Sequence, residues 1–286
     1  MTKYLIVNAD DLGISAGVSR GIIEAHQHGI VTSTTAMVNM PHATEAIHHA
    51  QKQAPRLGIG LHITLTEGKP LLPPDQVPSL VAAEGHFYTL EDFKQRNPNF
   101  SATELRAEIK AQFRRFVDIA RQLPDHLDAH HYAAYLNPDA FDMVLKLAAQ
   151  YRLPIRSAET YMTHAAMREV FIARGYPSAV VETLPAAILD RYAANDKPRW
   201  PDSTERGFYQ EGATLENLLH LLENLPDGTT ELMCHPGYIY DLDDNSYAAP
   251  REIERKLLMY PAVLETVERR NIRLITFSEL PRQTAV

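Results

Sequence analysis

Short apolar runs alternate with longer segments in which apolar residues recur every three to four positions. The short runs have the length of buried β-strands, and the longer periodic segments are typical of amphipathic helices. We expect strands at 4–7, 34–38, 57–63, 126–128, 153–155, 230–234 and 273–277. We expect helices at 15–28, from 101 onward, and at 139–150, 215–222, 250–259 and 261–270.

Alternation of strands and helices predicts parallel strands joined by right-handed crossovers. About seven strand–helix units fit an α/β barrel. We therefore favour an irregular (β/α) barrel over a doubly wound open sheet. No break in composition divides the chain, so we expect one domain over 1–286. The proline-rich stretch near 64–100 is expected to be a long loop insertion that acts as a binding loop or lid, and 196–212 is expected to be a second, polar loop.

Composition and charge narrow the functional classes. Of the 286 residues, 45% are hydrophobic, and 36 acidic against 28 basic residues give a formal net charge of −8. This negative charge disfavours nucleic acid and anionic membrane surfaces as partners. The single cysteine excludes an internal disulfide, and the first apolar run is too short for a signal peptide. We expect a cytoplasmic protein, with a homodimer as the default assembly.

Four of the expected strands end in groups that can bind a metal or titrate. The strand at 4–7 leads to Asp10 and Asp11, the strand at 57–63 contains His62, the strand at 126–128 leads to His130-His131, and the strand at 230–234 leads to His235. In parallel barrels the catalytic groups lie at the carboxyl ends of the strands. The sequence therefore predicts that these groups converge on one rim.

Such a cluster suits metal-assisted hydrolysis. One aspartate can bind a cation while its neighbour acts as a base, and two neutral imidazoles complete a site with open positions for water. His235 is then left as a proton donor, because histidine changes charge near neutral pH. Arg156 follows the strand at 153–155 and is expected either to orient Asp10 or to bind substrate.

Each motif also has an ordinary structural explanation. Paired aspartates after a strand often cap a helix, here the one that begins near Ser15. His62 can be a core histidine, His130-His131 a pair on a surface loop, and His-Pro-Gly at 235–237 a simple turn. All of these explanations would have to hold together for the site to vanish.

At these residues the sequence resembles the YdjC-like family of carbohydrate deacetylases, which includes chitooligosaccharide deacetylases. The matching segments follow the family's order and are 6–13 (IVNADDLG), 29–35 (GIVTSTT), 60–62 (GLH), 126–131 (HLDAHH) and 231–236 (ELMCHP). The resemblance implies an irregular (β/α) barrel related to polysaccharide deacetylases.

The resemblance also implies roles for individual residues. Asp11, His62 and His130 would bind one divalent metal, Asp10 would be the catalytic base and His235 the acid. His131 is expected to face the substrate. Where the family often has further histidines, this chain has Tyr132, Ala133 and Ala134, which puts the particular sugar in doubt.

The predicted activity is removal of N-acetyl groups from acetylated mono- or oligosaccharides, with release of acetate. Magnesium is the family's metal, although one carboxylate and two imidazoles suit zinc or another transition metal better. Two alternatives stay open. The same site can hydrolyse another amide or a phosphoester, or the barrel can bind sugar without catalysis.

Overall fold

The computed structural model describes residues 2–157, 162–242 and 247–281. Seven parallel strands form one curved sheet in the order β4-β3-β2-β1-β6-β5, with β7 also paired to β1. The strands are β1 Lys3–Leu12, β2 Ser33–Ala36, β3 Gly58–Ile63, β4 Leu127–Ala129, β5 Ser203–Glu205, β6 Gly228–Cys234 and β7 Arg273–Leu274. The expected α/β class with about seven parallel strands is confirmed.

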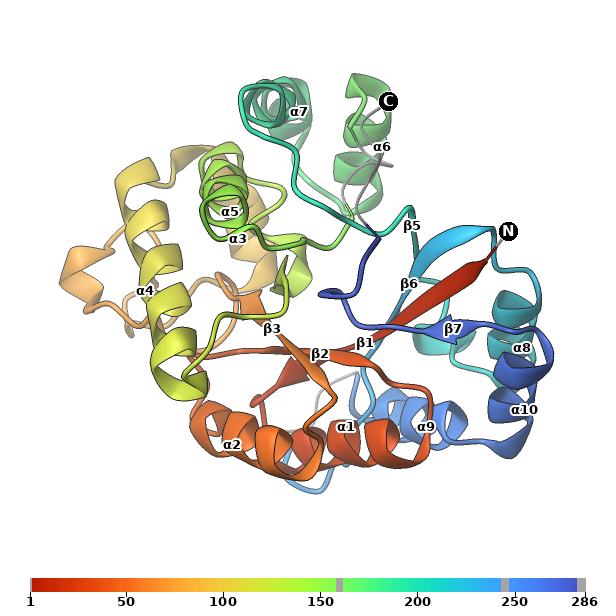
Figure 1. Ribbon diagram of the computed structural model, residues 1–286. Coiled ribbons are helices and arrows are strands. Elements are labelled where there is room, and N and C mark those ends of the chain that lie inside the picture. Colours follow the sequence, from red (N-terminus) through yellow and green to blue (C-terminus); the bar gives the residue numbers. More distant parts are fainter. Residues whose placement is uncertain (1, 158–161, 243–246, 282–286) are drawn as a thin grey trace.

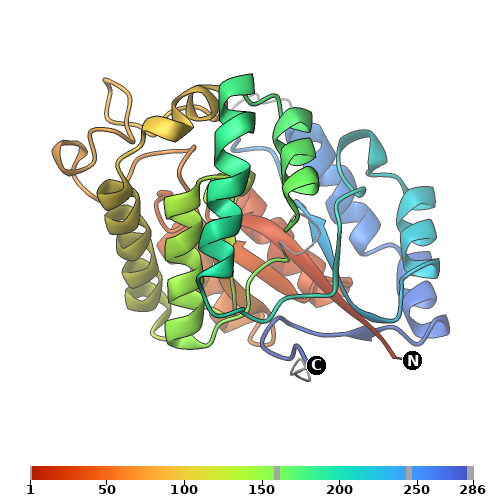
Figure 2. The same cartoon turned by 90° about the horizontal axis from the view of Figure 1, so that it is seen from above.

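Helices surround the sheet on its outer face (Figure 1). Figure 2 shows α4, α5 and α7 lying side by side along one flank. The α-helices are α1 Ala16–His28, α2 Ala43–Gln53, α3 Leu90–Arg96, α4 Ala102–Ala120, α5 Pro138–Tyr151, α6 His164–Ala173, α7 Ser178–Ala193, α8 Leu215–Glu223, α9 Ala248–Leu258 and α10 Pro261–Arg269.

The barrel is irregular at two places. At β1, the residues Tyr4 and Leu5 pair with β7, whereas β2 pairs farther along the same strand from Asn8 onward. Between β4 and β5 the sheet is open, and among the described residues Ile155 spans part of the gap. It forms a parallel bridge with Leu127, and its N–H donates to the carbonyl of Arg199.

Several elements differ from the sequence-based expectation. The expected strand at 153–155 is reduced to the bridge at Ile155, and the one at 273–277 is reduced to β7. The stretch 64–100 is not irregular throughout, since it contains α3 and two short 3₁₀ helices, and 196–212 contains β5. Helices α2, α6 and α7 were not expected.

Glycines on β3 make room for larger side chains from the two residues that precede β4. A Cβ at Gly60 would lie 2.5 Å from Cε1 of His126, and a Cβ at Gly58 would lie 2.7 Å from a carboxylate oxygen of Asp125. His126 is fully buried and stacks on Phe277 with ring centroids 3.7 Å apart. The glycines therefore accommodate packing below the site.

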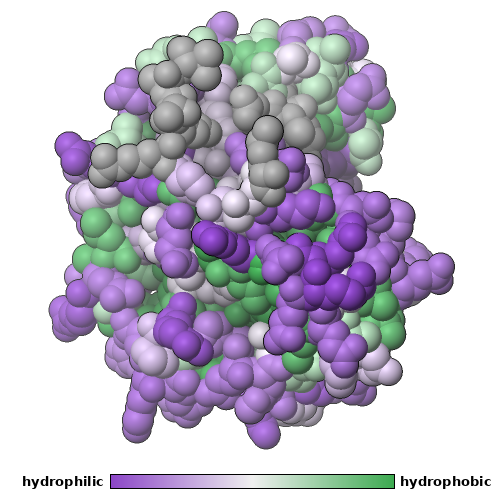
Figure 3. Space-filling model, turned by 45° about the vertical axis from the view of Figure 1, so that its right-hand side comes forward, coloured by the Kyte–Doolittle hydropathy of each residue, from purple (hydrophilic) through white to green (hydrophobic). Residues whose placement is uncertain are grey.

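The outer surface is mostly hydrophilic. The face in Figure 3 carries hydrophobic residues only in patches between polar ones. Across the described ranges, none of the helices combines the length and the apolar composition that a bilayer crossing requires.

Candidate active site

Two adjacent aspartates on β1 turn toward the same rim because the strand is distorted there. In a regular strand, neighbours point to opposite faces. The pairing with β2 shifts between Ala9 and Leu12, and Asp11 adopts a left-handed conformation with φ of 75°. Such a conformation costs a non-glycine residue about 1–3 kcal/mol and is concentrated at functional sites. The distortion lets Asp10 and Asp11 serve one cavity.

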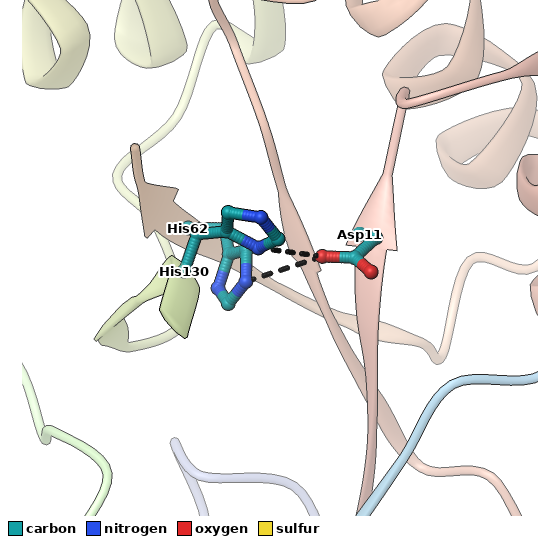
Figure 4. Close-up of side chains that lie close together, drawn as sticks. All are labelled: Asp11, His62 and His130. Atoms are coloured by element: carbon teal, nitrogen blue, oxygen red, sulfur yellow. Dashed lines mark ion pairs between the residues drawn. The ribbon is translucent and has the colours of Figure 1, made fainter. Parts of the chain in front are cut away.

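Asp11, His62 and His130 come together as one cluster (Figure 4). Oδ1 of Asp11 lies 3.3 Å from Nε2 of His62 and 3.2 Å from Nδ1 of His130. Within the described ranges, this buried oxygen has no hydrogen-bond partner. One orphaned carboxylate oxygen and two ring nitrogens that face it fit the donor set of a divalent metal. The expected three ligands are thus brought together.

The other ring nitrogen of His62 fixes the orientation of the imidazole. Nδ1 of His62 lies 2.6 Å from Oδ1 of the fully buried Asp128. Burial lowers the pKa of an imidazole, but the carboxylates of Asp128, Asp11 and Asp10 together outweigh burial and raise the pKa of His62 to about 10. A carboxylate on the outer nitrogen of a ligating histidine is the usual way in which a metal site orients its ligand.

Asp10, His62 and Asp128 form a second cluster with ligand-like spacing. Both oxygens of Asp10, however, accept hydrogen bonds from Arg156, at 2.8 and 2.6 Å. Nδ1 of His62 is likewise engaged with Asp128. The cluster around Asp11 is therefore the better metal site.

Arg156 is fully buried and orients Asp10 through hydrogen bonds to both carboxylate oxygens. Its Nε donates to the buried Glu231 at 2.7 Å, and its Nη1 lies 3.3 Å from Oδ2 of Asp128. Burial would raise the pKa of Asp10, but the Arg156 guanidinium, with His62 and His235, outweighs burial and lowers it to about 2. Of the two expected roles for Arg156, the contacts favour orienting Asp10 over binding substrate.

His235 approaches Asp10 from β6. Ala9 of β1 pairs with Cys234 of β6, so the next residue on each strand emerges at the same rim. Nε2 of His235 lies 3.8 Å from Oδ2 of Asp10. Burial lowers the pKa of His235 to about 4, so its ring is neutral at neutral pH.

Helix α9 contributes three polar side chains to the site. Nη2 of Arg251 lies 2.5 Å from Oδ2 of Asp11, whereas Oδ1 faces His62 and His130. Burial would raise the pKa of Asp11, but Arg251, His130 and His62 together outweigh burial and hold it well below its usual range. Tyr247, at the start of the helix, and Glu254 contact His235.

One cavity of about 320 Å³ joins most of these groups. It is lined by Asp10, Asp11, His62, His130, Arg156, His235, Tyr247 and Arg251, but not by Asp128, Glu231 or Glu254. His131 also lines it, as expected, and Oγ1 of Thr66 lies 3.0 Å from Nδ1 of its ring. Tyr132 forms part of the wall, where Nε of Arg206 donates to its hydroxyl and the guanidinium of Arg174 lies 4.6 Å from its ring. Four arginines therefore line the same cavity as Asp11, His62 and His130, namely Arg156, Arg174, Arg206 and Arg251.

Comparison with known families decides the assignment. The family model described as YdjC-like protein matches residues 4–269. The chain belongs to the YdjC-like family. A carbohydrate deacetylase of Thermoanaerobacter pseudethanolicus is 35% identical, covering 97% of this chain and 99% of the relative. A chitooligosaccharide deacetylase of Serratia marcescens is 33% identical, covering 98% of this chain and 100% of the relative.

A similar solved structure supports the fold. It comes from Enterococcus faecalis V583, where it is named as a proposed cellobiose-phosphate cleavage protein. It is 33% identical to this YdjC-like chain, with a TM-score of 0.78, covering 97% of this chain and 98% of the other.

The ordinary explanations for the motifs do not account for this arrangement. Helix α1 is capped by Ser15, whose hydroxyl accepts from the N–H of Val18, so Asp10 and Asp11 are not its caps. His62 is buried but faces Asp11, and His130 is not on a surface loop.

Sequence reasoning missed five residues around the site, namely Asp128, Glu231, Tyr247, Arg251 and Glu254. A signal for three of them was visible, because Tyr247, Arg251 and Glu254 recur with helical spacing and share one face of α9. Asp128 was visible by alternation, because it lies on β4 two residues before His130.

Proposed function

We propose that this YdjC-like protein is a metal-dependent hydrolase that removes N-acetyl groups from acetylated mono- or oligosaccharides and releases acetate. The observation that carries the proposal is the convergence of Asp11, His62 and His130 beside Asp10 and His235 in one cavity. The names of the similar carbohydrate and chitooligosaccharide deacetylases support an acetylated sugar as the substrate.

The metal would be held by Asp11, His62 and His130. A bound divalent cation polarises a carbonyl and makes water a stronger nucleophile. One carboxylate and two imidazoles suit zinc or another transition metal, whereas the family resemblance favours magnesium. Metal analysis of protein purified without added metal, followed by reconstitution with each ion, decides between them.

Asp10 and His235 would move the protons of the reaction. Asp10 takes a proton from the attacking water as the new C–O bond forms at the acetamide carbon. His235 is neutral at rest, so we infer that it receives that proton at Nε2 across the 3.8 Å gap from Asp10. It then protonates the sugar nitrogen as the C–N bond breaks, giving acetate and a free amine. His131 would contact the sugar from the cavity wall.

Acetate release tests the proposal and separates it from the alternatives. A panel of N-acetylated sugars, other amides and phosphoesters is incubated with the protein and several divalent ions. The deacetylase proposal expects acetate and free amine in equal amounts from at least one sugar. Turnover of only another amide or of a phosphoester would favour the second hydrolase class. Sugar binding that Asp10→Asn leaves intact, with no turnover by the wild type, would favour a binding barrel.

Other expectations of the sequence analysis stay predictions. These are a single domain over 1–286, a cytoplasmic location and a homodimer. Limited proteolysis, fractionation and light scattering test them in turn.

A further inference from the structure

The outer nitrogen of His235 faces a tyrosine that is itself held by a glutamate. Nδ1 of His235 lies 3.4 Å from the hydroxyl of Tyr247. That hydroxyl donates a short hydrogen bond to Oε1 of Glu254. The other oxygen, Oε2, accepts the backbone N–H of His235. Glu254 therefore holds both the backbone of His235 and the hydroxyl that faces its ring.

The direction of these hydrogen bonds follows from the chemistry of the groups. At pH 8, above its raised pKa of about 7, Glu254 is ionised and can only accept, so the hydroxyl proton of Tyr247 points toward Glu254. The tyrosine oxygen then presents a lone pair to Nδ1 of His235. A neutral imidazole carries a single N–H, and this arrangement places it on Nδ1.

We propose that Tyr247 and Glu254 are positioning residues that fix neutral His235 in the Nδ1–H tautomer, so that Nε2 faces Asp10 with a free lone pair. The proposal deepens the proposed function, because Nε2 must be bare to receive a proton. Neither residue needs to contact the substrate for this role.

The surrounding packing holds the pair in place. Glu254 is fully buried. The ring of Tyr247 stacks on Tyr209 with centroids 4.5 Å apart, and it meets His235 edge-on at 5.1 Å. Arg251, on the same helix, is paired with Asp11 and so ties α9 to the metal cluster. The tyrosine hydroxyl therefore has little freedom to turn away from Glu254 and His235.

Nitrogen NMR of ¹⁵N-histidine-labelled protein reads the tautomer directly, without substrate. The full chain is measured at pH 8, both as purified and reconstituted with Zn²⁺. We expect His235 of the wild type to be protonated at Nδ1. Tyr247→Phe should remove this preference. Glu254→Gln should reverse it, because the amide NH₂ donates to the tyrosine oxygen and turns its O–H toward Nδ1.

Tyr260→Phe and Glu252→Gln are matched controls on exposed or partly exposed side chains and should leave the tautomer unchanged. A wild-type signal from Nε2–H would overturn the proposal. It would also be overturned if both Tyr247→Phe and Glu254→Gln, folded by circular dichroism, kept the wild-type tautomer.

Kinetics give a second readout on the sugar that releases acetate. Tyr247→Phe is expected to lower kcat about 10- to 100-fold with KM nearly unchanged, because proton transfer and not binding is impaired. An unchanged kcat would contradict the role in catalysis. If no sugar released acetate, the proposed function would fail, whereas the tautomer would still be decided by NMR.

Discussion

Oδ2 of Asp10 lies 3.8 Å from Nε2 of His235, although the two residues are far apart in the sequence. Their strands β1 and β6 are neighbours, with Ala9 opposite Cys234, so the register of the sheet places them side by side. Arg156 donates hydrogen bonds to the carboxylate of Asp10, and the hydroxyl of Tyr247 lies beside Nδ1 of His235. A proton accepted by one of the pair therefore has a short path to the other.

Asp128 is predicted to strengthen metal binding through His62. Asp128→Asn keeps an acceptor for Nδ1 but removes the negative charge that makes the imidazole a better donor. We expect the affinity for the divalent ion to fall about 10- to 100-fold. Titration of metal-free protein by calorimetry measures it. Asp125→Asn, just before β4, is the control. An equal loss of metal affinity in both variants would contradict the prediction.

Gly60 is predicted to be required for packing inside the barrel. An alanine Cβ would lie 2.5 Å from Cε1 of His126, which is buried against Phe277 and cannot move away. We expect Gly60→Ala to lower the free energy of unfolding by about 1–3 kcal/mol.

Urea unfolding measures this loss. Gly207→Ala is the matched control, because its Cβ meets no heavy atom within 4 Å. The double variant Gly60→Ala/His126→Ala should recover part of the loss. A Gly60→Ala protein as stable as Gly207→Ala would show that the interior is looser than the structure indicates.

Glu254 is predicted to make stability depend on pH. Burial raises the pKa of Glu254 from 4.5 to about 7, which means that the folded state binds this proton more tightly than the unfolded state. Stability linked to Glu254 is therefore fully present below pH 4.5 and is lost as pH rises to about 7. The shift corresponds to about 3 kcal/mol.

The comparison with Glu254→Gln isolates this contribution. The free energy of unfolding of the wild type should fall by about 3 kcal/mol relative to the variant between pH 4.5 and pH 8. Urea unfolding at a series of pH values gives both curves. If the free energies of unfolding of the wild type and the variant changed equally with pH, Glu254 would have the same pKa in the folded and unfolded states, and the prediction would be wrong.

Much of the site was predictable because it lies at the ends of periodic, buried strands. The apolar runs before Asp10, His62 and His235 place each group at the rim once the strands are parallel. The distortion at Asp11 was not predictable, since a left-handed conformation usually signals glycine and the sequence has aspartate there.

Other parts depended on tertiary packing that a single sequence does not reveal. Tyr247, Arg251 and Glu254 form a polar helix face, which by itself resembles a solvated surface. Only the packing of α9 against α1, with its side chains reaching Asp11 and His235, turns that face toward the site. Helix α7 was missed because Pro185 lies inside it, and proline normally ends a helix.

The most direct test of the account is acetate release by metal-loaded wild type and Asp10→Asn, with bound metal measured in the same samples. Asp10 is not a metal ligand in this account, so both proteins should hold equal amounts of the ion. The wild type should release acetate and free amine from an N-acetylated sugar, and the variant should do so about 10²- to 10⁴-fold more slowly. Equal rates, or loss of metal together with activity in Asp10→Asn, would contradict the assigned roles of Asp10 and Asp11.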